Sequence, residues 1–194
     1  YLYANSAAFA AAGVTYDTPD PAGGNFGRSN GKFTGVIGEA PAMMMMLGAM
    51  PKPTPAQIGA GILEILNECA KQGVTSLREG ATGSLAGVSE VAMLHQLNSA
   101  KRLPVRVSTA QFAIMQGKTP EQVAQTWKDA GVTPFSGDEM VRADAWKVIT
   151  DGSNQGRSGY FFQPYLGENA GGHANWTPET LRDVLSVGLD AGWQ

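Results

Sequence analysis

Residues 146–160, WKVITDGSNQGRSGY, join a strand-like run to a polar loop that carries charged and amide side chains. Alternation along a strand over 145–150 would place Lys147 on the same face as Ile149 and Asp151. A lysine on a buried strand face needs a partner charge or a chemical role. An outward lysine on an edge strand is instead a common protection against aggregation. Spacing alone leaves both interpretations of Lys147 open.

Polar side chains also follow two other strand-like runs, 74–77 and 104–110. The carboxyl ends of parallel strands meet at one edge of a sheet, so we expect the polar residues there to converge in one bowl. The alternative is that they are ordinary turn and helix-cap residues. The residues at the three ends are Glu79, Gln111, Asp151, Asn154 and Gln155.

The segment 54–194 alternates helix-like and strand-like stretches. Three helices are predicted to start with a threonine cap followed by proline, at Thr54, Thr119 and Thr177, and a further helix is predicted over 85–100. Strands that alternate with helices of this length indicate parallel βαβ units, in either a (β/α) barrel or a doubly wound sheet. Three strands are too few for either fold, so the outer strands would keep open edges, through which another chain or a second copy could pair.

The segment 1–53 has a different texture, with many turn signals. A short helix is predicted over 6–12, and Asn30-Gly31 is a strong hairpin signal between strands over 25–29 and 32–37. We therefore expect two parts, 1–53 and 54–194.

Composition excludes several classes of protein. The net charge of −3 gives no basis for binding nucleic acid or an anionic membrane. A single cysteine, Cys69, excludes a disulfide scaffold, and no apolar run is long enough to span a bilayer. His95 and His173 lack metal-site spacing, and the glycines between 80 and 87 do not match a nucleotide-binding fingerprint, which argues against a nucleotide-binding doubly wound domain. With no signal peptide in sequence, a cytoplasmic location is expected.

Several motifs, in order, resemble amidohydrolase family 3, which includes N-substituted formamide deformylase and related metal-dependent hydrolases. The segment before the barrel strands is similar over 3–42, including DTPDPAGG and TGVIGE. GVTSLRE is similar to the second barrel strand of that family, LPVRV to the third, and WKVITDGS to the fourth. The segment GRSGYFFQPY resembles the stretch that follows the fourth strand.

The resemblance implies a partial (β/α)8 TIM-type barrel, strands two to four, preceded by an insert with a β-hairpin. It also implies hydrolysis of C–N bonds in amide-type small molecules by metal-activated water. The lysine of the fourth-strand motif is typically carboxylated and bridges two divalent metals, usually zinc, and that position is Lys147 here. Polar residues of the following loop are candidates for substrate binding, and Arg157 could pair with a substrate carboxylate. The substrate-binding candidates are Asp151, Asn154, Gln155, Arg157 and Tyr165.

The sequence departs from the family at the other metal ligands. The first-strand HxH, the later histidines and the aspartate of the eighth strand have no counterpart here. We therefore expect the middle of an amidohydrolase, inactive alone and without a bound metal. The alternative is a non-catalytic βα module that assembles with another chain, or with its own copy, through open sheet edges.

Overall fold

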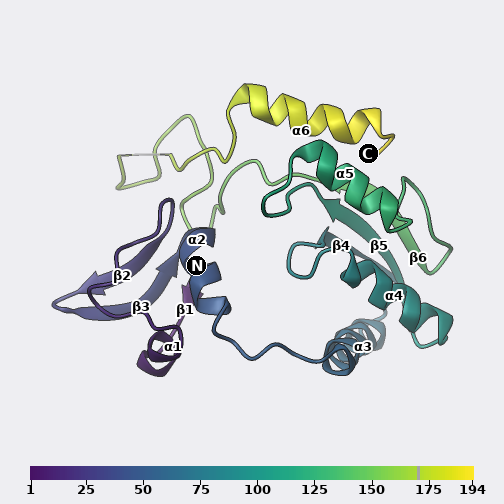
Figure 1. Ribbon diagram of the computed structural model, residues 1–194, viewed down its shortest axis with the longest axis horizontal. Helices are drawn as coiled ribbons and strands as arrows, with labels where there is room; N and C mark the ends of the chain where they lie inside the picture. The colour runs from purple at the N-terminus through teal and green to yellow at the C-terminus, as the bar shows by residue number, and fades with distance from the viewer. Residues whose placement is uncertain (170) are drawn as a thin grey trace. The chain divides into compact units, whose positions relative to one another are not determined.

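A computed structural model describes residues 1–169 and 171–194, which form two compact units, Tyr1–Pro53 and Thr54–Gln194 (Figure 1). The first unit contains the strands β1 (Leu2–Tyr3), β2 (Asn25–Ser29) and β3 (Lys32–Gly38) and the helices α1 (Ser6–Ala11) and α2 (Glu39–Leu47). Its strands pair antiparallel in the order β1-β3-β2. The predicted hairpin is confirmed: Asn30 and Gly31 both have positive φ, as a tight two-residue turn requires.

Arg28 ties the proline-rich segment 17–24 to this hairpin. Its guanidinium donates to Asp20 Oδ1 at 2.6 Å and to the carbonyls of Tyr16, Thr18 and Phe26. The rings of Tyr16, Phe26 and Phe33 lie within 5.3–5.8 Å of it. Asp20 also accepts from the backbone N–H of Phe26 at 3.0 Å. A segment without regular structure is thereby fixed to the sheet.

Asp20 should make the first unit sensitive to acid. The hydrogen bond from Phe26 N–H and the bond from Arg28 lower the pKa of Asp20 below its ordinary value of 3.8. A carboxyl whose folded pKa is depressed stabilises the fold above its unfolded pKa, and this stabilisation is lost as pH falls through the folded value. Hydrogen exchange of the Phe26 amide, corrected for its intrinsic pH dependence, should therefore show less protection below pH 3.8 than at neutral pH. Asp20→Asn should remove most of this difference, and an unchanged pH dependence in that variant would contradict the assignment.

The second unit alternates helices with parallel strands. It contains α3 (Pro55–Lys71), β4 (Ser76–Thr82), α4 (Ser89–Ser99), β5 (Arg106–Phe112), α5 (Pro120–Asp129), β6 (Val141–Lys147) and α6 (Pro178–Asp190). The sheet order is β4-β5-β6, with both pairs parallel. The mixed α/β class with parallel βαβ units is confirmed.

Helix starts follow the local sequence closely. Thr54, Thr119 and Thr177 cap α3, α5 and α6, each with a capping box and a proline in the first turn. The helix predicted over 85–100 begins later, at Ser89. The reason is that the Glu90 carboxylate accepts from the backbone of Gly83, Leu85 and Ala86, which holds the preceding residues in a turn.

All four helices of the second unit pack on one face of its sheet (Figure 1). One cluster joins α3 and α4 to Val107 and Val141. A second cluster, around the fully buried Trp127, joins α4, α5 and α6 to Ala143 and Trp146. Val107, Val141, Ala143 and Trp146 therefore mark the helix side of the sheet. Among the described residues, no helix combines the length and apolar character needed to cross a membrane.

Candidate functional site

The third strand of the sheet, β6, ends at Lys147, and the polar loop of the segment 146–160 follows it. Its predicted range was 145–150, but β6 covers Val141–Lys147, so Lys147 is the last strand residue. The apolar run that follows leaves the sheet because its carbonyls take other partners. Ile149 O accepts from Trp176 Nε1 at 2.7 Å and from Asn175 Nδ2 at 3.3 Å.

Lys147 lies on the face of the sheet opposite the helices. Its neighbours Trp146 and Val148 both pack into the helix-side core, and alternation turns the residue between them to the other face. Lys147 is half-buried and pairs in register with Phe112 at the carboxyl end of β5. This is the edge of a parallel sheet at which α/β proteins place reactive groups.

We call the face opposite the helices the polar face, because Arg78, Ser108 and Asp144 meet on it. Arg78 Nη2 lies 2.6 Å from Asp144 Oδ2, and Arg78 Nε lies 3.3 Å from Ser108 Oγ. Arg78 is 52% exposed, whereas Asp144 is only 17% exposed. Asp144 Oδ1 is buried and accepts no hydrogen bond from the described residues. Such an oxygen carries a desolvation cost, so it is an acceptor available to a further donor.

Asp151 closes the loop that follows Lys147. Its Oδ2 accepts from Tyr160 N at 2.9 Å and its Oδ1 from Thr150 Oγ1 at 3.0 Å. Its backbone forms an antiparallel bridge with Ala174 and accepts from Asn175 Nδ2 at 3.2 Å. Both ends of the segment 151–175 are therefore held together next to the end of β6.

Two of the other loop candidates, Arg157 and Tyr165, bond another residue of the loop through their side chains. Arg157 Nη1 lies 3.0 Å from Glu168 Oε1, and Tyr165 Oη donates to Gly159 O at 3.1 Å. Asn154 and Gln155 are exposed, and the Asn154 carbonyl accepts from Arg157 N. Two parts of the loop approach closely, since a side chain at Gly172 would collide with the backbone of Ser158 and Gly159. Arg157 and Tyr165 therefore brace the loop.

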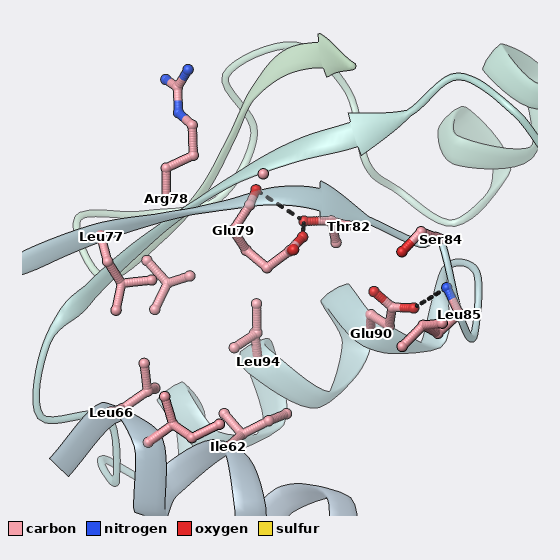
Figure 2. A pocket seen from close by; sticks show the side chains of 13 residues that line it. Ile62, Leu66, Leu77, Arg78, Glu79, Thr82, Ser84, Leu85, Glu90 and Leu94 are labelled. Carbon is pink, nitrogen blue, oxygen red and sulfur yellow. Dashed lines mark hydrogen bonds between the residues drawn. The ribbon is translucent and has the colours of Figure 1, made fainter. Parts of the chain in front are cut away.

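Glu79 and Gln111 do not join the other strand-end residues. Figure 2 shows Glu79 directed toward Leu94 and Ile62 on the helices, with Arg78 directed away from them. Glu79 Oε1 accepts from Ala81 N at 3.1 Å, within a pocket of about 440 Å³ that is lined mainly by aliphatic side chains. Gln111 is fully buried. The expected bowl is therefore not formed, because Glu79 alternates in phase with Leu77 and Gln111 in phase with Val107, and both Leu77 and Val107 pack on the helices.

Metal-binding side chains do not cluster within the described part of the chain. His95 lies in α4 and His173 in the loop before α6. Among residues 1–169 and 171–194, no three His, Cys, Asp or Glu side chains gather in a way that could hold a metal ion.

Sequence reasoning missed Asp144, Asn175 and Trp176. Asp144 lay outside the strand expected over 145–150, and the other two residues bond Ile149, which is 26 or more residues away.

Comparisons with known proteins agree with this architecture. Over 200 residues the chain is 26% identical to the putative amidohydrolase YtcJ of Bacillus subtilis (strain 168), covering 98% of this chain and 34% of that protein. The structure resembles the crystal structure of an uncharacterized metal-dependent hydrolase from Pyrococcus horikoshii OT3. That match has a TM-score of 0.62 and 17% identity, and it covers 88% of this chain and 33% of the other. The chain thus spans about a third of the length of the curated relative it matches. The model of the amidohydrolase family matches residues 2–194, and the chain belongs to that family.

Proposed function

We propose that residues 1–194 supply the middle of a metal-dependent hydrolase that cleaves C–N bonds of amide-type small molecules. Support comes from the family match and from the position of Lys147, on the polar face at the carboxyl end of a parallel strand. In this proposal Thr54–Gln194 is a segment of a (β/α)8 barrel, comprising strands two to four, and Tyr1–Pro53 is an insert. The formamide deformylase subgroup stays a prediction.

Lys147 is the proposed metal ligand, in carboxylated form, with zinc as the expected metal. Its half-buried position beside Phe112 suits a ligand held by a rigid strand. The described residues supply this one ligand, so they do not fit a complete metal centre by themselves. When bound, such a metal centre would lower the pKa of a bound water and polarise the scissile carbonyl. The remaining ligands would have to come from outside these 194 residues.

Residues 151–169 and 171–175 of the loop form the proposed wall of the substrate pocket. Asp151, Arg157 and Tyr165 hold its shape through bonds to Tyr160 N, Glu168 and Gly159 O. Exposed Asn154 and Gln155 are the groups best placed to contact an amide-type substrate. A carboxylate on the substrate would have to compete with Glu168 for Arg157.

A hybrid protein tests this function. Residues 1–194 would replace the matched segment of the Bacillus subtilis relative, and the hybrid would be assayed on a panel of N-acyl and N-formyl amines with zinc and bicarbonate present. The hybrid should hydrolyse at least one of these compounds, whereas the 194-residue chain alone should hydrolyse none and retain no zinc after dialysis. About two equivalents of tightly bound zinc in the chain alone, as in a complete two-metal site, would contradict the proposal.

A second candidate function, a βα module that assembles through its sheet edges, is favoured by the outer strand β4. Among the described strands, β4 pairs only with β5, and the apolar pocket beside it is lined by Ile62, Leu66 and Leu77. An unpaired strand next to apolar side chains suits the addition of another strand. A stable dimer of the chain by sedimentation, lost when Leu77 is replaced by lysine, would favour this function over the hydrolase.

A further inference from the structure

An irregularity in β6 decides which face of the sheet Lys147 occupies. β5 and β6 pair one to one from Val107↔Val141 to Thr109↔Ala143, but the next pair is Ala110↔Ala145. β6 therefore has one residue more than β5 at this point, which is a β-bulge.

Without the bulge, Lys147 would face the helices. Val141 and Ala143 point to the helix side, and strict alternation would carry Ala145 and Lys147 to that side too. The extra residue shifts the pattern by one, so Trp146 enters the helix-side core and Lys147 turns to the polar face. A one-residue change of register would exchange the places of the indole and the ammonium group.

The side chain of Gln111 bridges the two strands at this bulge. With its amide oriented as the surrounding donors and acceptors require, Nε2 donates to Thr109 O at 3.0 Å and to Ala145 O at 3.1 Å. Its Oε1 accepts from Thr109 Oγ1 at 2.7 Å. Gln111 is fully buried, as is Thr109. A bulge interrupts the ladder and leaves backbone groups in need of partners, and this amide bonds a carbonyl on each strand.

We propose that Gln111 is a positioning residue whose amide holds the β6 bulge and thereby directs Lys147 to the polar face. A buried amide destabilises the fold unless its N–H and C=O groups are hydrogen-bonded, and both N–H groups of Gln111 donate to carbonyls at the bulge. The importance of this geometry for catalysis rests on the proposed role of Lys147 as a metal ligand. The geometry itself does not, so it can be tested on the purified chain without metal.

The test measures the rate at which Lys147 is acetylated by an amine-reactive ester. After acetylation, cleavage at arginine releases residues 143–157, in which Lys147 is the only lysine, so mass spectrometry reads this one site. Gln111→Met keeps the length of the side chain and removes its N–H donors. It should slow acetylation of Lys147 at least about tenfold, because an amine on the helix side reacts only when the core opens.

The matched control is Thr82→Val. Thr82 is also fully buried on the sheet and pairs with Gln111 across β4 and β5, but its hydroxyl contacts Glu79 and not the bulge in β6. This variant should lose stability while the acetylation rate of Lys147 stays within about twofold of the unmodified chain, because the bonds of Gln111 to the carbonyls at the bulge remain.

Deletion of Ala145 in the Gln111→Met variant should restore both the acetylation of Lys147 and the stability of the fold. A strand without the extra residue alternates regularly, so Trp146 and Lys147 return to their native faces and no bulge carbonyl needs the amide. Acetylation should recover, and the double variant should unfold at higher denaturant than Gln111→Met alone. The proposal is overturned if Gln111→Met reacts like the unmodified chain, if Thr82→Val slows the reaction equally, or if the deletion restores neither reactivity nor stability. If Gln111→Met does not fold, the double variant must fold for the proposal to stand.

Discussion

Lys147→Ala should reduce hydrolysis by the hybrid protein at least about a hundredfold, because residues that merely support a metal ligand already contribute 10–100-fold in metal affinity or activity. The loss should fall on kcat, since Asn154, Gln155 and the rest of the loop 151–175 remain to bind substrate. Steady-state kinetics on the best amide-type substrate measure the effect.

The matched control for this prediction is Lys128→Ala. Lys128 is exposed in the last turn of α5, away from the sheet edge that carries Lys147. Its replacement should leave kcat unchanged. Full activity in the Lys147→Ala hybrid would remove Lys147 from the proposed metal centre, even if the hybrid remained a hydrolase.

Gly188→Ala should strongly destabilise the second unit. Gly188 is buried in α6, and a Cβ there would lie 2.6 Å from Trp146 Cγ and 3.0 Å from Trp146 Nε1. Trp146 is pinned by its hydrogen bond to Val184 O at 3.0 Å, so the ring cannot move away without losing that bond. We expect a loss of about 3 kcal/mol in the free energy of unfolding, at the upper end of overpacking penalties. Urea unfolding followed by tryptophan fluorescence measures it.

Gly61→Ala provides the matched control on another helix. Gly61 lies inside α3, and a Cβ there would meet nothing within 4 Å. The same chemical change should therefore raise stability by about 0.5–1 kcal/mol, because alanine loses less entropy than glycine in a helix. Equal effects of the two substitutions would show that close packing on Trp146 is not what Gly188 provides.

Local signals predicted the parts of the fold that depend on neighbouring residues. The Asn30-Gly31 hairpin turn and the threonine caps Thr54, Thr119 and Thr177 appear as expected, since each is satisfied within a few residues. The parallel sheet followed from the alternation of helices and strands.

Features that depend on distant contacts were not predictable. The strand-forming run Val148-Ile149-Thr150 leaves the sheet because Asn175 and Trp176 bond its carbonyls. The side of the sheet that Lys147 faces depends on a bulge that no local pattern encodes.

The candidate site was predicted in part. Lys147 and Asp151 were singled out: Lys147 is the last residue of β6, and Asp151 bridges Ala174 in the segment that follows. Glu79 and Gln111 were expected in the same bowl but point to the helix side, because they alternate in phase with Leu77 and Val107, whose packing on the helices only the structure shows. The pairing of Arg78 with Asp144 needed the structure, since 66 residues separate them in sequence.

The most direct test of Lys147 as a metal ligand is the metal content of the hybrid protein with Lys147 and with Lys147→Ala, measured by elemental analysis after dialysis. We expect bound zinc in the hybrid and a loss of most of it in Lys147→Ala, while circular dichroism shows both proteins folded. Equal zinc content in the two folded proteins would contradict the claim that this strand supplies a metal ligand.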